Sequence, residues 1–166
     1  MGRIAANTSA RVREVLAANG ALQAQIQVLA LEAGVHEPGI QVASQLVVRN
    51  VAADLAEKTA GVMYPAFFVY CDKISNSLRE KFRTFSGTAR MVVETRASQD
   101  RLEGLEDRLH IYADAVMSVL DAKRGDWGQG MFYTGGYEVA FGPVKHGGKH
   151  FIQTAKVVFD VEISAD

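Results

Sequence analysis

Two histidines four residues apart, His146 and His150, come closest in type and spacing to a metal site. On a helix, imidazoles at that spacing share one face and can ligate zinc. Here Gly147 and Gly148 lie between them, which favours a flexible hairpin loop with exposed basic residues. A metalloenzyme that uses these histidines and a carboxylate is therefore the least favoured of three hypotheses.

The other reactive side chains do not form a recognisable active site. Cys71 follows Tyr70 in an apolar segment and has no adjacent histidine to activate it, which favours core packing over nucleophilic chemistry. The glycine-rich residues 125–136 match neither the P-loop nor the dinucleotide fingerprint, because both motifs need a following helix that faces the phosphate. We therefore predict no catalytic residue, no metal, no cofactor and no enzymatic activity.

Basic and aromatic side chains instead indicate three candidate contact segments. Basic residues interleaved with aromatics can bind nucleic acid through phosphates and stacking, and an exposed tryptophan in a glycine-rich loop suits an interface anchor. The predicted interface consists of Arg79, Lys81, Phe82, Arg83, Phe85, Trp127, Lys145, His146, Lys149 and His150. The competing interpretation of each segment is a solvated loop with some packed aromatics.

Length, composition and charge favour one folded domain that lacks a strong positive electrostatic field for binding nucleic acid. The 166 residues are 48% hydrophobic and 22% charged, unlike disordered chains. The formal net charge of −1 argues against a module that binds phosphates over a whole face. One cysteine cannot form an intrachain disulfide, and no apolar stretch is long enough to cross a bilayer. We expect a soluble protein of the cytoplasm without a membrane partner.

The first third of the chain has helical patterns. Residues 8–33 are rich in Ala, Leu, Gln and Val, and the pair Asn19-Gly20 predicts either two short helices or one broken helix. From Ile40 to Thr59 apolar residues recur every three or four positions, which predicts an amphipathic helix. We expect residues 1–60 to form an N-terminal helical segment and residues 61–166 to form an α+β domain.

Strand patterns and one long helix follow. Aromatic and β-branched residues predict strands at 64–71 and 88–95, joined over 75–86 by a polar, basic segment that forms a long hairpin loop or a short helix. An apolar stripe of helical period predicts a helix from Gln99 to Lys123, roughly 35 Å long. Its stripe consists of Leu102, Leu105, Leu109, Tyr112, Ala113, Val116, Met117 and Leu120.

The C-terminal region predicts two further strands and completes the fold class. Residues 137–141 have strand character, and the last strand alternates apolar and polar residues from Ala155 to Ile163. The predicted fold is α+β: an antiparallel β-β-α-β-β sheet with one long helix packed on it, preceded by the N-terminal helical segment.

This order of elements resembles the tail-terminator and tail-completion (neck) proteins of long-tailed bacteriophages. The resemblance covers residues 64–166: an early hairpin with a long loop, a helix that begins after Ser98-Gln99-Asp100, a Gly/Trp loop, and a closing amphipathic strand from Ile152 to Ser164. The likeness lies in the order of the elements and in their residue patterns, and it includes no catalytic motif.

The resemblance implies a structural virion protein that forms a homo-hexameric ring. Such a ring caps the tail tube, contacts the tail tube protein and the head-tail connector proteins, and surrounds a lumen through which DNA passes. Its location would be the virion tail and neck, after assembly in the host cytoplasm. The alternative hypothesis is a small module that binds nucleic acid or an anion through the loops Arg79–Phe85 and Lys145–His150.

Overall fold

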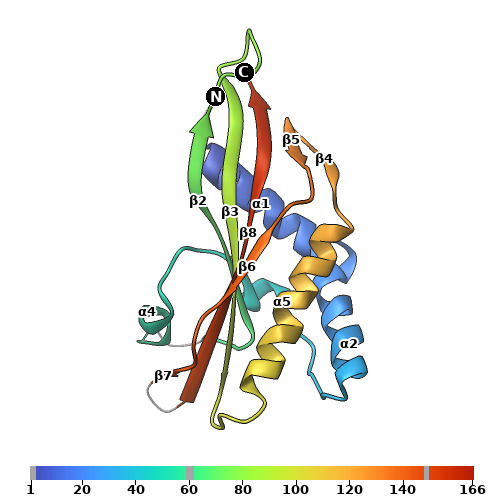
Figure 1. The fold of residues 1–166 in the computed structure, drawn as a ribbon, viewed down its shortest axis with the longest axis vertical. Coiled ribbons are helices and arrows are strands. Elements are labelled where there is room, and N and C mark those ends of the chain that lie inside the picture. The colour runs from blue at the N-terminus through green and yellow to red at the C-terminus, as the bar shows by residue number, and fades with distance from the viewer. Residues whose placement is uncertain (1–2, 59–61, 148–149) are drawn as a thin grey trace.

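Three long strands determine the length of the molecule, for which a computed structural model describes residues 3–58, 62–147 and 150–166 (Figure 1). They are β2 (Ala66–Asn76), β3 (Phe85–Gln99) and β8 (His150–Ala165). The β3 and β8 strands pair antiparallel without a register shift from Phe85↔Ala165 to Gln99↔Phe151. At about 3.4 Å per residue this ladder is about 50 Å long.

Shorter strands complete a mixed sheet of eight strands. The main order is β1-β2-β3-β8-β5-β4, and β6 and β7 also pair with β8. The short strands are β1 (Leu46–Val48), β4 (Gly125–Gly128), β5 (Met131–Tyr133), β6 (Glu138–Phe141) and β7 (Lys145–Gly147).

The predicted antiparallel β-β-α-β-β sheet with one long helix is therefore wrong. The structure is α+β, but β1 runs parallel to β2 and the sheet is curled.

The N-terminal region forms two helices, as its composition indicated. They are α1 (Ile4–Ala17) and α2 (Ala21–Ala33), separated by a short 3₁₀ turn at Ala18–Gly20. Asn19 and Gly20 have φ angles of 54° and 67°, in the left-handed region. Asn and Gly tolerate this conformation better than other residues, so the pair ends the first helix.

The predicted helix from Ile40 to Thr59 is wrong. Its described residues form the short helix α3 (Val42–Gln45), strand β1 and the helix α4 (Ala53–Lys58), while residues 59–61 lie outside the described part of the chain. Strand β1 pairs with Phe67–Val69 of β2. The β-branched Val47 and Val48 suit a strand, and long-range pairing with β2 outweighs the helical spacing of the apolar residues.

The helix α5 (Leu105–Asp121) is shorter than predicted, about 25 Å long. Gln99, the predicted first residue, is the last residue of β3, a turn over residues 100–104 follows it, and Gly104 (φ 79°) precedes the first helical residue. The Gln99 amide donates hydrogen bonds to the carbonyl oxygens of Arg101 and Glu103, which holds the turn between strand and helix. Leu102 therefore lies outside the helix and is exposed.

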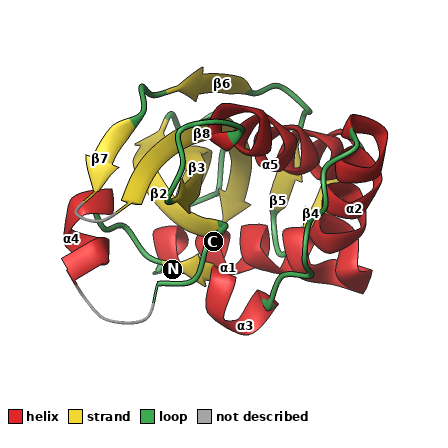
Figure 2. Cartoon of the chain, turned by 90° about the horizontal axis from the view of Figure 1, so that it is seen from below, coloured by secondary structure: helices red, strands yellow, loops and turns green. Residues whose placement is uncertain are grey.

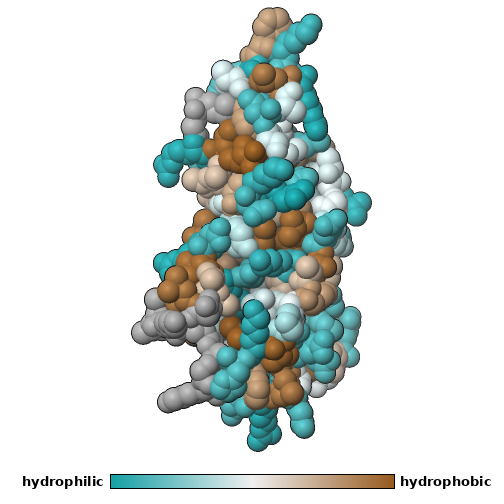
Figure 3. Space-filling model, turned by 60° about the vertical axis from the view of Figure 1, so that its left-hand side comes forward, coloured by the Kyte–Doolittle hydropathy of each residue, from teal (hydrophilic) through white to brown (hydrophobic). Residues whose placement is uncertain are grey.

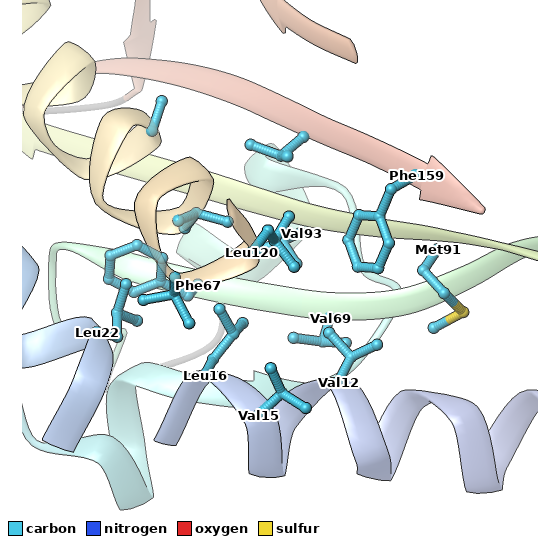
Figure 4. Close-up of a cluster of buried hydrophobic side chains, with 14 of the residues drawn as sticks. Val12, Val15, Leu16, Leu22, Phe67, Val69, Met91, Val93, Leu120 and Phe159 are labelled. Carbon is cyan, nitrogen blue, oxygen red and sulfur yellow. The ribbon is translucent and has the colours of Figure 1, made fainter. Parts of the chain in front are cut away.

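The main core lies between the sheet and the helices α1 and α5. Figure 2, which looks along the molecule, shows the strands curled between these two helices, with α2 beside α5. Val12, Val15 and Leu16 of α1 point toward β2 (Figure 4). The predicted alternation of β8 is confirmed, since its inward residues are all buried: Ala155, Val157, Phe159, Val161 and Ile163.

A smaller cluster on the opposite face of the sheet lies under α4. It contains Ala56, Ala66 and Phe68. Beside Phe68 lies Arg96, whose side chain is 1% exposed and whose guanidinium carbon is 4.0 Å from the centre of the Phe68 ring. Arg96 donates from Nε to Glu94 Oε2 (2.6 Å) and from Nη2 to Glu94 and to the Val51 carbonyl. The Arg96 charge is thus neutralised where it is buried, as a charge in a low-dielectric site must be.

Candidate assembly surfaces

The β2–β3 hairpin projects its connecting loop, residues 77–84, beyond the rest of the sheet (Figure 1). Asn76 organises this loop: its Oδ1 accepts from the backbone N–H groups of Leu78 and Ser86, and its amide donates to the Thr84 carbonyl. The Glu80 N–H donates to Ser86 Oγ. We call residues 77–84 the tip loop. Its conformation is fixed by side-chain hydrogen bonds, as in a preformed recognition loop.

Two of the three predicted basic residues of the tip loop form ion pairs. Arg79 lies 3.7 Å from Glu162, and Arg83 lies 2.8 Å from Asp166. Both carboxylates belong to the C-terminal end of the chain, so the pairs tie the tip loop to the end of β8. Among the described residues Lys81 has no ion-pair partner. Its charge is therefore available to a partner molecule.

The two phenylalanines of this segment have opposite environments. Phe82 is 100% exposed, at the end of the tip loop. Phe85, predicted as an interface residue, is 4% exposed and belongs to the main core. This is a correction: Phe85 is the first residue of β3, and the alternation of that strand turns its ring toward the helices.

The second predicted loop lies at the other end of the sheet. Lys145 and His146 belong to β7, which pairs with the start of β8 at His150, and the His146 ring contacts Phe151 edge to face at 5.5 Å. Lys149 lies outside the described residues. Within residues 3–58, 62–147 and 150–166, no three His, Cys, Asp or Glu side chains gather as metal ligands would.

The two predicted loops do not converge within one copy. Strand β8 begins at His150 beside β7 and ends at Ala165, whose carbonyl accepts a hydrogen bond from Thr84 of the tip loop. The loops are therefore about 50 Å apart, the length of the β3–β8 ladder. A small anion cannot contact both loops of one chain.

Trp127, the third predicted contact, is packed against the protein. Its indole N–H donates to the Lys123 carbonyl (2.7 Å), and its ring lies 5.3 Å from Tyr133 and 6.5 Å from Phe159. A tryptophan whose polar and apolar parts are both engaged fixes the β4–β5 hairpin to the core. Its half-buried side chain supports the structure of that hairpin.

Strand β2 has an uncovered edge. Strand β1 covers only Phe67–Val69, and the Arg49 N–H adds one bond to the Val69 carbonyl. Beyond this point no described segment pairs with the outer side of β2, and Asp72–Asn76 are exposed, including Ile74 at 42%. In a space-filling view turned toward this side, hydrophobic atoms form small clusters separated by hydrophilic ones (Figure 3). An unpaired strand edge is a template for pairing with another chain.

The solvent face of α5 is acidic. Glu106, Asp107, Asp114 and Asp121 are exposed, and with Arg108 they give the helix a formal net charge of −3. In the free edge and tip loop, residues 71–84, Arg79 and Arg83 are paired with Glu162 and Asp166, whereas Lys73 and Lys81 have no ion-pair partner among the described residues. Two different sides of the molecule therefore carry complementary groups, unpaired lysines on one and carboxylates on the other.

A buried polar contact that the sequence did not reveal joins the N-terminal segment to α5. The Tyr112 hydroxyl donates to Glu37 Oε1 (2.7 Å), and Arg108 Nε lies 3.7 Å from the same oxygen. Burial and then the Glu37 hydrogen bond raise the pKa of Tyr112. No sequence signal pairs residues 75 positions apart in this way, and the helical period predicts Tyr112 only as part of the apolar stripe.

We expect the protein to lose stability in alkali, because the pKa values of three tyrosines are raised in the folded chain. Burial raises the pKa of Tyr70 and of Tyr133 to about 12, from an ordinary value of 10.0, and Tyr112 is shifted in the same direction. Their stabilising contribution is complete below pH 10 and is lost as the pH rises from 10 to 12, because only the unfolded chain then releases these protons.

Urea unfolding at pH 8, 10 and 11 checks this expectation. The midpoint should fall above pH 10 in the wild type, and it should fall less in Tyr70→Phe, which has one fewer shifted phenol. A midpoint that is constant up to pH 11 would contradict the assignment of these buried phenols.

Cys71 lies where β2 has an irregular register, between Cys71 and Lys73. Its thiol is half-buried, donates weakly to the Lys73 carbonyl, and has a pKa raised by burial. Such a thiol is a poor nucleophile.

No described helix has both the length and the apolar character needed to span a membrane. The chain matches no protein-family model, and a search of curated proteins gives no match either.

Proposed function

We propose that this chain is a structural assembly protein, a subunit of a homo-hexameric ring that caps a bacteriophage tail tube and joins it to the neck proteins of the head. The observation that carries the proposal is the uncovered edge of β2 on a sheet about 50 Å long. Five exposed residues, Asp72–Asn76, extend past the last partner strand at this edge. An unpaired strand edge can accept a strand from another chain.

The charge distribution supports contacts between copies of the same chain. A ring requires a heterologous interface, in which two different surfaces of one subunit meet the complementary surfaces of its neighbours. The edge and tip loop with the unpaired Lys73 and Lys81, and the acidic face of α5, are two such surfaces. Opposite charge on them attracts a neighbouring copy in one orientation and repels like surfaces.

The two ends of the long sheet suit contacts above and below a ring. The β7–β8 hairpin with Lys145 and His146 lies at one end, and the tip loop extends from the other toward a neighbouring copy. In the proposed assembly one end of the sheet faces the tail tube protein and the other faces the connector, with DNA passing through the lumen. The virion is the proposed location, reached after assembly in the host cytoplasm.

Electron microscopy of tail tubes tests this function. The tail tube protein from the same genome is allowed to polymerise with and without the purified chain, and the tubes are measured by negative staining. We expect the chain to cosediment with the tubes, to form a distinct cap at one end and to stop further growth. Tubes that grow equally with and without the chain, with no bound cap, would contradict the proposal.

A further inference from the structure

Phe82 has a conformation that the folding of one copy does not explain. Its φ angle is 70°, in the left-handed region, and its side chain is fully exposed. For a bulky residue this backbone conformation is rare and costly, and such residues concentrate at functional sites. Leu78 in the same loop also has a positive φ, of 47°, and is exposed. The loop thus holds a large aromatic ring in water at an energetic cost.

A notch where β5 and β6 pair with β8, on the side of the sheet away from β2, is large enough for a phenylalanine ring. Strand β6 pairs with β8 as far as Val158, and β5 resumes the pairing at Glu162. Between them lies a cavity of about 340 Å³. Its lining consists of Arg90, Thr134, Gly136, Tyr137, Glu138, Val158, Phe159 and Asp160. A cavity of roughly 150 Å³ can hold a benzene ring, so the notch has room for a phenylalanine side chain with space to spare.

The chemistry of the notch complements the tip loop. Tyr137 and Val158 provide the apolar part of the lining, and Arg90, Thr134, Glu138 and Asp160 provide a polar part. Arg90 lies 3.6 Å from Asp160, whereas Glu138 is exposed and has no ion-pair partner among the described residues. Lys81, next to Phe82, is likewise unpaired within the described chain. An aromatic anchor beside a cation can contact Tyr137 and Val158 in the notch while the cation faces the Glu138 carboxylate.

The tip loop cannot reach the notch of its own chain. Strands β2 and β3 pair continuously up to Asn76↔Gly87, directly below the loop, and Arg79 is tied to Glu162 and Arg83 to Asp166. Phe82 is therefore held at the end of the hairpin, away from the side of the sheet. The notch therefore cannot receive this ring from its own chain.

We propose that Phe82 of one copy binds in the notch between β5 and β6 of the next copy, with Lys81 beside Glu138. The proposal rests on the proposed function, since it assigns the contact that links neighbouring subunits of the ring. The two surfaces differ, so the contact is heterologous and repeats around a closed ring.

Site-specific cross-linking tests the contact directly. The photoreactive amino acid benzoylphenylalanine replaces Phe82 in the full chain, and this variant is mixed with isotopically labelled wild type before irradiation. We expect cross-links to labelled peptides that contain Tyr137-Glu138 or Val158–Asp160. Cross-links only to other regions, or none in particles that are rings, would overturn the inference and leave the proposed function standing.

A charge exchange provides the second test. Lys81→Glu and Glu138→Lys should each weaken assembly about tenfold or more, since like charges then face each other across the interface. The double variant should recover most of the loss. Leu31→Ala, which truncates an exposed residue of α2 far from both surfaces, is the matched control and should assemble normally. Two single variants that assemble as the wild type does would overturn the contact, and a chain that is monomeric at every concentration would contradict both proposals.

Discussion

Replacing Arg96 by alanine is expected to lower the free energy of unfolding by about 3–5 kcal/mol, the range found when one partner of a buried ion pair is removed. The Arg96 side chain is 1% exposed and holds Glu94 through two nitrogens, while its guanidinium stacks on Phe68. Without it the buried Glu94 carboxylate retains only Lys156, whose Nζ lies 3.7 Å away and is half exposed.

A double variant separates the buried charge from the lost packing. Glu94→Gln with Arg96→Met removes both charges and retains side chains of similar length, so it should lose less stability than Arg96→Ala alone. Urea unfolding followed by circular dichroism measures all three proteins. A loss of less than about 1 kcal/mol in Arg96→Ala would show that the pair is solvated and not buried as described.

Leu16→Ala is expected to cost about 2–5 kcal/mol, the usual loss when a buried leucine is truncated in a core. Leu16 is fully buried and lies with Phe67 and Leu22 in the main core (Figure 4). The large cost is expected because α1 shares this core with β2 and α5. An N-terminal segment that folded apart from the sheet would unfold in a separate transition.

Leu31→Ala is the matched control for this prediction. Leu31 is 82% exposed on α2, and surface substitutions of this kind usually change stability by about 0.5 kcal/mol or less. Both variants are unfolded in urea at the same protein concentration, so that assembly affects them equally. Equal small losses, or two transitions in which only the first responds to Leu16→Ala, would contradict a shared core.

The sequence predicted the elements whose patterns are local. The apolar stripe of α5 and the alternation of β8 each bury one face, and the periodicity of a buried face is visible in one chain. The break at Asn19-Gly20 was also predicted, since the conformational preference of these two residues is local.

The elements that the sequence missed depend on distant partners. Strand β1 has only three residues and forms because β2 offers its outer edge. Strands β4, β5 and β7 have only three or four residues and lie in glycine-rich segments, where turn signals outweigh strand signals. The parallel pairing of β1 and β2 therefore could not be predicted from spacing.

Composition alone predicted part of the candidate interface. Phe82 and Lys81 are exposed in the tip loop, but Phe85 three residues later is a core residue, and no pattern distinguishes the two rings in one dimension. The notch was not predicted, because it arises from a gap between β5 and β6 along β8. The Arg96–Glu94 pair and the Tyr112–Glu37 contact were missed because a buried charge and an exposed one look alike in a sequence.

The mass of the protein in solution tests the central claim, that this chain works by assembling with its own copies. It is measured by light scattering after size exclusion, at two protein concentrations and at low and high salt. We expect a particle of about six times the 18.0 kDa chain mass, or a monomer that converts to it as concentration rises, with weaker assembly at high salt. A monomer whose mass is independent of both concentration and salt would contradict the claim.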